Sequence, residues 1–244
     1  MAKRKKKAVA KKAKKRNNSC VNTLIPNAVF ETMRTYGGKV FALNEHLERL
    51  FRSAELLGID PKHSQADILR EIGYCPTESK VRVHLTAEKF TVQILPLPSV
   101  DPNIYSEGVT VCDRVFERPF PRAKYETLMY EDVLNAQGEH FETLFFSEEG
   151  FLREGNISNV FAVFKGTVVT PKKNILLGVT REKVVQLIGE NNIPFEEREI
   201  SREELMTADE IFLTNTTKEI IPVRKWGGWR SGAFEIAQKL RELF

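Results

Sequence analysis

The chain has 244 residues, of which 41% are hydrophobic, so it can bury the core of two modest domains or of one large one. It contains no run of about 18 apolar residues and no apolar segment behind its basic N-terminus, so we expect neither a transmembrane helix nor a secretory signal. The three cysteines, Cys20, Cys75 and Cys112, have no metal-ligand spacing, and their odd number argues against a disulfide framework. A reducing cytoplasm is the expected location.

The net charge of +4 comes from one end of the chain. Residues 1–16 hold ten Lys or Arg and no acid, which leaves 27 basic and 33 acidic side chains in the rest, a net charge of −6. Because like charges repel, we expect residues 1–17 to be a disordered basic tail. It either attracts nucleic acid nonspecifically or is a solvated extension, and the second is favoured because no aromatic residue interrupts it to stack on bases.

Strands and helices alternate in the first half of the chain. Gly37-Gly38 is a hairpin signal, Asn44 is predicted to cap a helix, and Gly58 is predicted to end that helix. The predicted elements are a strand at 29–36, its hairpin partner at 39–43, helices at 44–57 and 65–72, and two strands within 79–98. The proline-rich segment that follows is predicted to be a linker between domains.

The second half repeats the alternation. The predicted strands lie at 109–116, 142–146, 160–164, 167–169 and 210–213, and the predicted helices at 127–137, at 181–190 and from a cap at Ser231. The interleaving predicts an α/β chain. We divide it into the tail (1–17), a small N-terminal α/β domain (18–97), a linker (98–104) and a larger C-terminal α/β domain (105–244).

Three features have the chemistry of an anion site. Gly178-Val179-Thr180 precedes a helix whose first N–H groups lack partners, so it either binds a phosphate or makes an ordinary cap at Thr180. Thr214-Asn215-Thr216-Thr217 follows a strand and is either an anion cradle or a polar loop. Arg49 falls opposite the apolar stripe of its helix, either as a solvated charge or as a guanidinium directed at a phosphate.

Two further residues have the chemistry of a cofactor enzyme. Glu154, in the run EGNISN, is either a turn residue or a carboxylate that keeps a pyridine-type nitrogen protonated. Lys124, after RPFPRA, is either a surface group or a desolvated Schiff-base lysine, and Tyr130 could orient a cofactor's phenolate oxygen or lie at the edge of the core. A carboxylate one hairpin away from a helix-start anion site suits pyridoxal 5'-phosphate, which has a ring nitrogen opposite its phosphate.

Other kinds of site are not indicated. The four histidines, His46, His63, His84 and His140, lack metal-ligand spacing, so no metal site is predicted. The nucleophile-elbow, P-loop and dinucleotide-binding signatures are absent from the sequence.

Four runs occur in an order that resembles the class IV pyridoxal-phosphate aminotransferases, which include branched-chain and D-amino acid aminotransferases and aminodeoxychorismate lyases. They are VFETMRTYGGKVFALNEHLERLFRSAELLGI (29–59), EGNISNVFAVFKGTVVTP (154–171), ILLGVTR (175–181) and ADEIFLTNTTKEIIPV (208–223). The resemblance implies a two-domain architecture of the fold-type IV pyridoxal-phosphate enzymes. The family begins with two more strands and a D-R-G-type motif, which the basic tail replaces here, so a truncated N-terminal domain is expected.

The resemblance also implies roles. Lys124 would form the Schiff base with the cofactor, and Glu154 would be the partner of its ring nitrogen. Binding of the cofactor is implied for Arg49, Tyr130, Glu154, Leu176, Val179, Thr180, Asn215 and Thr216. The family's spacing from Tyr130 puts the lysine at Tyr125, and a one-residue insertion after Lys124 restores the match. The implied partners are an amino acid, with branched-chain amino acids as one class, a 2-oxo acid and a second copy of the chain in a homodimer.

Three functions follow from these features. The leading hypothesis is an aminotransferase that acts through Lys124. An aminodeoxychorismate lyase would use the same lysine to eliminate pyruvate. A non-catalytic relative would bind the cofactor without a Schiff-base lysine.

Overall fold

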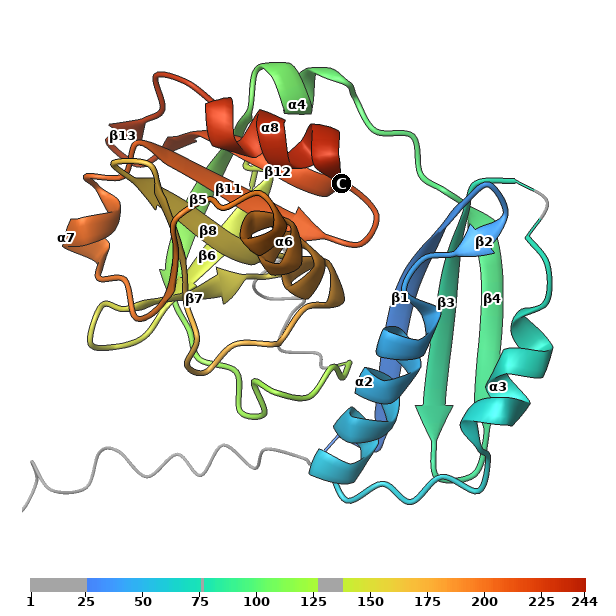
Figure 1. The fold of residues 1–244 in the computed structure, drawn as a ribbon. Coiled ribbons are helices and arrows are strands. Elements are labelled where there is room, and N and C mark those ends of the chain that lie inside the picture. The colour runs from blue at the N-terminus through green and yellow to red at the C-terminus, as the bar shows by residue number, and fades with distance from the viewer. Residues whose placement is uncertain (1–25, 76, 127–137) are drawn as a thin grey trace, which may run out of the picture.

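The computed structural model describes residues 26–75, 77–126 and 138–244, which form two lobes, each around its own β-sheet (Figure 1). The predicted α/β class is confirmed. Within the described residues, no helix combines the length and the apolarity needed to cross a membrane. The basic tail, Cys20 and the predicted helix over 127–137 lie outside the described residues.

The small lobe contains a four-stranded antiparallel sheet in the order β2-β1-β3-β4. Its residues alternate between two faces, because successive side chains of a strand point to opposite sides. In β1, Val29, Glu31 and Met33 are buried on one face, whereas Phe30 and Thr32 lie on the other. The strands are β1 (Ala28–Tyr36), β2 (Lys39–Val40), β3 (Ser79–Thr86) and β4 (Phe90–Pro96).

Two helices, α2 (Leu43–Leu56) and α3 (Gln65–Ile72), cover the buried face of this sheet (Figure 1). The predicted cap of α2 is wrong, because its N-cap is Ala42 in the left-handed conformation and Asn44 already lies inside the first turn. Gly58 has a φ of 69° and follows the helix end as predicted. The opposite face of the sheet is therefore left available to the large lobe.

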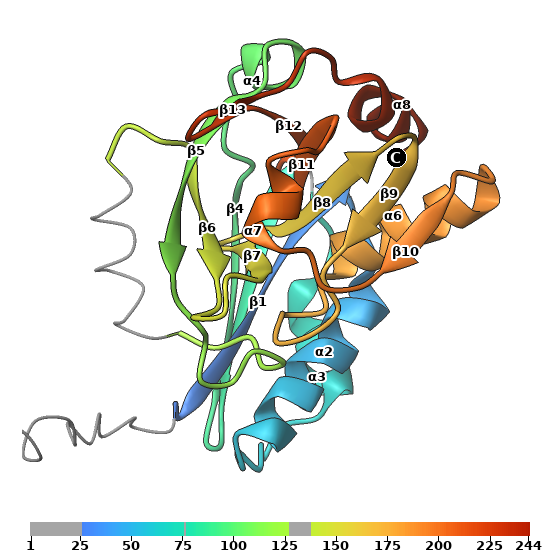
Figure 2. The ribbon, with the colours of Figure 1, turned by 90° about the vertical axis from the view of Figure 1, so that its left-hand side faces the viewer.

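The large lobe contains a nine-stranded mixed sheet in the order β10-β9-β8-β11-β12-β5-β6-β7, with β13 beside β12. Figure 2 shows β5 to β7 and β9 to β10 on opposite sides of this lobe. The consecutive strands β7 and β8 are nevertheless joined by a short loop in which the Gly155 N–H donates to Ser158 O at 2.8 Å, so the sheet curls back on itself.

Most strands of this sheet are largely buried, whereas β10 at its edge is partly exposed. They are β5 (Val109–Val115), β6 (Glu142–Phe146), β7 (Leu152–Gly155), β8 (Asn159–Phe164), β9 (Thr167–Thr170), β10 (Phe195–Glu197), β11 (Glu210–Asn215), β12 (Glu219–Trp226) and β13 (Trp229–Arg230). Four of them, β7, β10, β12 and β13, were not among the predicted strands. In β12, Pro222 interrupts the strand pattern in the sequence.

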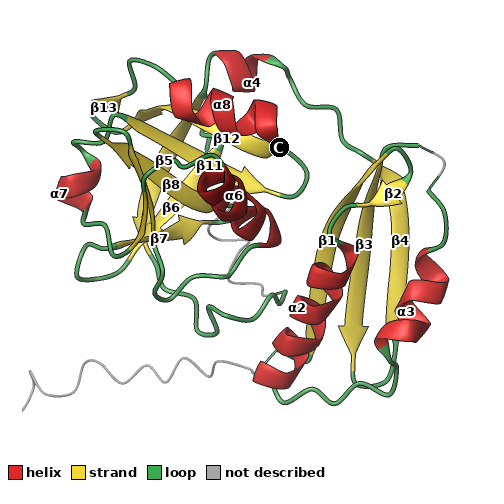
Figure 3. Cartoon of the chain, in the orientation of Figure 1, coloured by secondary structure: helices red, strands yellow, loops and turns green. Residues whose placement is uncertain are grey.

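Helices lie around the periphery of the large lobe (Figure 3). They are α4 (Asn103–Ser106), α6 (Val179–Glu190), α7 (Arg202–Leu205) and α8 (Glu235–Leu243). The apolar sides of α6 and α8 pack together against β8, β11 and β12. The prediction that Ser231 caps the last helix is wrong, because the N-cap of α8 is Phe234 and the Ser231 hydroxyl donates to Ala233 O instead.

Candidate active site

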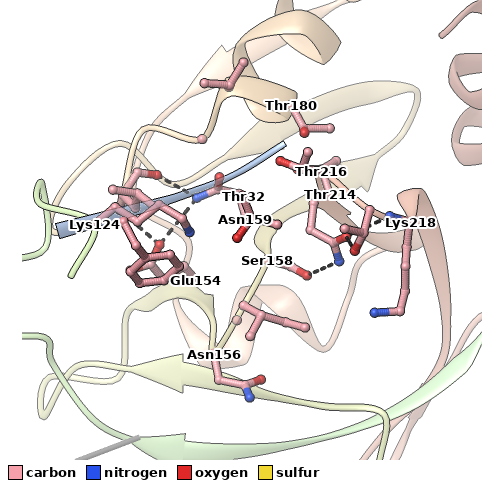
Figure 4. A pocket seen from close by; sticks show the side chains of 18 of the residues that line it. Thr32, Lys124, Glu154, Asn156, Ser158, Asn159, Thr180, Thr214, Thr216 and Lys218 are labelled. Atoms are coloured by element: carbon pink, nitrogen blue, oxygen red, sulfur yellow. Dashed lines mark hydrogen bonds between the residues drawn. The ribbon is translucent and has the colours of Figure 1, made fainter. Parts of the chain in front are cut away.

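A cavity of about 720 Å³ lies between the outer face of the small sheet and the large lobe (Figure 4). Every candidate site residue in the described part of the chain lines it: Arg49, Lys124, Glu154, Leu176, Val179, Thr180, Asn215 and Thr216. Tyr130 lies outside the described residues. Segments far apart in the sequence thus contribute to one site, whose size is within the range of small-molecule pockets.

One end of the cavity is formed by the start of α6. Thr180 is the second residue of this helix rather than its cap, and the N-cap is Gly178. A Cβ on Gly178 would come within 2.1 Å of Asn159 Oδ1, so only glycine lets the helix start approach β8 this closely. The Asn159 side chain donates to Leu176 O at 2.8 Å, which fixes the segment before the helix. The N–H groups of this first helical turn can receive an anion.

Arg49 is buried, with 7% of its surface exposed, so the predicted alternative of a solvated charge is wrong. It lies only about 100° from Leu50 around the helix and flanks the stripe. Its Nε and Nη2 atoms donate to the two carboxylate oxygens of Glu31 at 2.6 and 2.8 Å, and Nη1 donates to Leu177 O at 3.1 Å. Arg49 therefore connects α2, the small sheet and the segment that leads into α6.

The buried Glu31 carboxylate also contacts His46 Nδ1 at 2.8 Å. Burial alone would raise the pKa of Glu31, but the Arg49 charge and the hydrogen bonds from His46 and Arg49 outweigh it and lower that pKa. Burial lowers the pKa of His46 despite Glu31. The positive charge of Arg49 is thus held in place by an ionised partner behind it, while the side chain still lines the cavity.

Glu154, which ends β7, is 4% exposed and has a fixed orientation. One of its oxygens accepts from Arg118 Nη1 at 3.0 Å. The other accepts from the Leu176 N–H at 3.0 Å and lies 3.5 Å from Asn159 Nδ2. Such a carboxylate can hold a protonated ring nitrogen beside it.

Lys124 lies on the same side of the cavity as Glu154 in Figure 4. Its backbone is anchored on both sides, because its N–H donates to Ser53 Oγ at 3.0 Å and its carbonyl accepts from the Phe30 N–H at 3.2 Å. Burial, and next the charge of Arg49, lower the pKa of the Lys124 amine to about 8. An amine with this pKa is neutral in a useful fraction of molecules near neutral pH, as a nucleophile or base must be.

The loop between β11 and β12 closes another side of the cavity. The Asn215 side chain donates to Ser158 Oγ at 3.0 Å and accepts from the Lys218 N–H at 3.0 Å. Thr214 Oγ1 is buried without a hydrogen-bond partner among the described residues. A buried hydroxyl in a cavity wall can satisfy its hydrogen bond with a ligand.

Ser158 is held in turn by Glu142, a buried residue of β6. Glu142 Oε1 accepts from the N–H groups of Ile157 and Ser158 at 2.9 and 2.8 Å, and Oε2 accepts from Ser158 Oγ at 2.7 Å. Burial, only partly opposed by these hydrogen bonds, raises the pKa of Glu142 to about 7. The carboxyl group thus organises the 155–158 loop from behind the cavity.

Several contributors to the site were not predicted from the sequence. The sequence could have indicated Glu31, because a charged residue at an inward position of an apolar strand requires a partner. Asn159 belongs to the EGNISN run that drew attention to Glu154. Arg118 had no such signal, because its pairing with Glu154 joins segments that the sequence pattern does not connect.

Comparisons with known proteins agree with this geometry. The sequence profile of the family described as amino-transferase class IV matches residues 28–226. The D-alanine aminotransferase of Bacillus licheniformis is 30% identical over 234 residues, which cover 85% of this chain and 81% of that protein. The chain therefore belongs to the class IV aminotransferase family, whose cofactor is pyridoxal 5'-phosphate.

Solved structures confirm the fold-type IV architecture. A branched-chain aminotransferase of Thermoproteus uzoniensis with norvaline is 26% identical, with a TM-score of 0.78 and coverage of 91% of this chain and 87% of that chain. An aminotransferase of Brucella abortus bound to pyridoxal phosphate is 25% identical, with a TM-score of 0.78 and coverage of 91% and 89%. The 4-amino-4-deoxychorismate lyase of Pseudomonas aeruginosa, at 22% identity, a TM-score of 0.76 and 89% coverage of each chain, shares the fold.

The residues present fit this cofactor. The start of α6, Arg49 and the orphaned hydroxyl of Thr214 provide donors for a phosphate. The buried carboxylate of Glu154 suits a protonated pyridine nitrogen, and the Lys124 amine lines the same cavity. The hydrogen-bond donors thus match the phosphate of pyridoxal phosphate, and the Glu154 carboxylate matches the ring nitrogen at its other end.

Proposed function

We propose that this chain is an aminotransferase that moves an amino group between an amino acid and a 2-oxo acid, with Lys124 as its catalytic residue. One observation carries the proposal: the Lys124 amine shares a cavity with a buried carboxylate and a helix start. Bound pyridoxal phosphate would supply an aldehyde that links to amines and a ring that accepts the electron pair left on the substrate's α-carbon.

Lys124 has two tasks in this proposal. Its Nζ atom would hold the cofactor through the aldehyde that the cofactor supplies, until a substrate amine takes that place. Once free, the Lys124 amine would take the proton from the substrate's α-carbon and hold it for its return during the same turnover. The lowered pKa of about 8 serves both tasks, because both require the neutral amine.

The other residues position the cofactor. Glu154 keeps the ring nitrogen protonated, and Arg118 and the Leu176 N–H fix the orientation of that carboxylate. Val179, Thr180, Asn215 and Thr216 would hold the phosphate, with Arg49 braced behind it by Glu31. Leu176 would pack against the ring face.

Borohydride reduction followed by peptide mapping tests the proposal. In protein loaded with pyridoxal phosphate, reduction should remove the absorbance band of the lysine-bound cofactor. The reduced cofactor, which labels the peptide that carries it, should map to Lys124. Lys124→Ala should abolish the label, whereas Lys239→Ala, which alters an exposed lysine of α8, should leave it intact. A label on another lysine, or no uptake of the cofactor, would overturn the assignment.

A lyase that releases pyruvate from aminodeoxychorismate is the second candidate, since a lyase shares this fold. It would use the same lysine and the same electron-accepting ring. Pyruvate release from that substrate without an amino acceptor would favour the lyase. Amino transfer to a 2-oxo acid supports the leading proposal instead. A non-catalytic relative would bind the cofactor, release it on dialysis and give no reducible link.

The assembly and location also belong to this proposal. We expect a homodimer in the cytoplasm. Light scattering on the loaded protein tests the homodimer through its mass.

A further inference from the structure

A hydrogen-bond network connects a buried carboxyl group with the loop between β11 and β12. Glu142 of β6 is fully buried and is not among the described residues that line the cavity. Its Oε2 atom accepts from Ser158 Oγ at 2.7 Å, and Ser158 Oγ accepts from Asn215 Nδ2 at 3.0 Å. The Glu142–Ser158–Asn215 network thus runs from the interior of the large lobe to the cavity wall.

The Glu142 carboxyl group is also fixed at its other oxygen. Oε1 accepts from the N–H groups of Ile157 and Ser158 at 2.9 and 2.8 Å. Gly155 packs so closely on the same atom that a Cβ at this position would lie 2.2 Å from it. Because the carboxyl group is held in one position, it can serve as a rigid anchor for the Ser158 hydroxyl.

At the other end of the network, Asn215 determines the conformation of its loop. Its Oδ1 atom accepts from the Lys218 N–H at 3.0 Å, which closes a turn. Both polar atoms of the side chain are therefore used inside the protein, and together they set the direction of the loop that contains Thr216. Figure 4 shows Thr216 and Ser158 on one side of the cavity and Lys124 on the other.

We infer that Glu142 is a positioning residue for the phosphate end of the cofactor, acting through Ser158 on the loop that contains Asn215. The inference rests on the proposed function, under which that loop holds the phosphate. Without its acceptor the Ser158 hydroxyl can rotate, and the Asn215 amide loses a fixed partner, so the loop meets the phosphate with less order. The ring end is held by Glu154, whose hydrogen bonds do not pass through this network.

A comparison of two cofactor forms tests the inference, because pyridoxal lacks the phosphate. Absorbance titration of the cofactor-free protein gives both affinities. Glu142→Ala and Ser158→Ala should each weaken binding of pyridoxal phosphate by roughly 10-fold, the effect of one hydrogen bond, and leave binding of pyridoxal nearly unchanged. The double variant should lose no more than either single variant, because both changes break the same network. Glu142→Gln should restore binding, since its amide can accept from the two N–H groups and donate to Ser158 Oγ.

Glu210 provides the matched control for the loss of a buried carboxyl group. It lies at the start of β11, is buried, and is not among the described residues that line the cavity. Its oxygens accept from the N–H groups of Ile236 and Ala237 at 2.9 and 3.1 Å. Glu210→Ala should lower the stability but keep the ratio of the two affinities. An equal fall of both affinities in Glu142→Ala, or the same change of ratio in Glu210→Ala, would overturn the inference.

The ionisation of Glu142 provides a second readout. Burial raises its pKa to about 7, against its hydrogen bonds and the charge of Lys218. Of the adjoining strands, β5 presents Cys112, whose Sγ atom lies 3.8 Å from the Glu142 carbonyl oxygen, and β7 presents the uncharged Gly155. The ionised carboxylate accepts from the Ser158 hydroxyl. The protonated form must donate to it instead, since its other oxygen already receives two N–H groups.

This reversal should reach Asn215 in the cofactor-free protein, where NMR separates the inference from the proposed function. The side-chain amide signals of Asn215 should shift with an inflection near pH 7 and stay constant in Glu142→Gln. The Asn191 amide, which donates to Leu187 O at 2.9 Å, is the internal control and should not shift there. Constant Asn215 signals in the wild type would overturn the inference. Titrating signals in a protein that takes up neither cofactor form would support the network and refute the aminotransferase alone.

Discussion

Lys124 combines a place in the cavity with a pKa of about 8, well below the ordinary value for lysine. Burial is the main cause, and the neighbouring Arg49 adds to it, while Glu31 and Glu154 oppose it. The pKa of this one side chain is thus set by charges on three different elements, α2, β1 and β7. A lysine on the surface would keep its proton through the whole physiological range.

We predict that the Lys124 amine of cofactor-free protein gains reactivity as the pH rises through about 8. Only the neutral amine reacts, so its labelling by acetic anhydride should increase through that pH and then level off. Mass spectrometry of peptides from protein labelled at several pH values measures this. Exposed Lys239 of α8 is the internal control, because it corrects for the change of the reagent itself with pH. Identical profiles for the two lysines would contradict the prediction.

The same shift changes stability with pH in a defined direction. The folded protein releases the Lys124 proton near pH 8, whereas the unfolded chain retains it to near the ordinary lysine pKa of 10.5. Between these values the unfolded state binds more protons, so this lysine makes stability rise with pH there. Below pH 8, the buried charge of Lys124 lowers the free energy of unfolding by its full amount. Lys124→Met should therefore stabilise the cofactor-free protein most at pH 7, measured by urea unfolding, and this advantage should shrink toward pH 10.

Helix α6 depends on a close approach to β8 at its first residues. We predict that Gly178→Ala weakens cofactor binding at least roughly tenfold, because the new methyl group would displace Asn159, which positions Glu154 and Leu176. Fluorescence titration with pyridoxal phosphate measures this. Gly189→Ala in the same helix is the matched control, since its Cβ would meet nothing within 4 Å. That variant should bind normally and gain roughly 0.5–1 kcal/mol of stability.

Strand β6 stabilises the neighbouring 155–158 loop through the Glu142 carboxyl. We predict that Glu142→Ala destabilises the protein by roughly 2–4 kcal/mol, because three donors of Ile157 and Ser158 lose their acceptor inside the protein. Glu142→Gln should cost much less, since its amide can accept from the two N–H groups. Because the pKa of Glu142 is raised to about 7, stability from this group falls as the pH rises from 4.5 to 7. The glutamine variant should lack that slope in urea unfolding between pH 5 and 7.

The elements differ in how well their sequences predicted them. Gly37-Gly38 and the alternation of β1 and β3 identified the small sheet, because hairpins are encoded locally. Glu154, Gly178 and Asn215 could be assigned to a site because they lie in compact motifs. The Arg118–Glu154 pair and the burial of Arg49 could not, since they arise only when distant segments meet. Ala42 as the cap of α2 is likewise set by the turn before it rather than by its own side chain.

The two lobes are joined by a contact that also borders the cavity. Glu219 accepts from Arg34 at 2.7 Å and from the Tyr36 hydroxyl at 2.8 Å, and burial together with this carboxylate raises the pKa of Tyr36. Glu219 adopts a φ of 61°, which is unusual for a residue other than glycine. The contact therefore holds the end of the loop that contains Asn215 and Lys218 in one position relative to the small sheet.

We predict that this contact couples the two lobes energetically. A double-mutant cycle with Arg34→Met and Glu219→Gln should give a coupling energy of about 1–2 kcal/mol in urea unfolding, because both side chains are largely buried and charged. The control cycle uses Lys173→Met and Glu199→Gln, an ion pair in which the lysine side chain is 69% exposed. Its coupling should stay below about 0.5 kcal/mol. The Glu219→Gln variant should also bind pyridoxal phosphate more weakly, since its loop carries Asn215 and Thr216 into the cavity. Equal coupling in the two cycles, with unchanged cofactor affinity, would mean that the lobes hold their arrangement without Glu219.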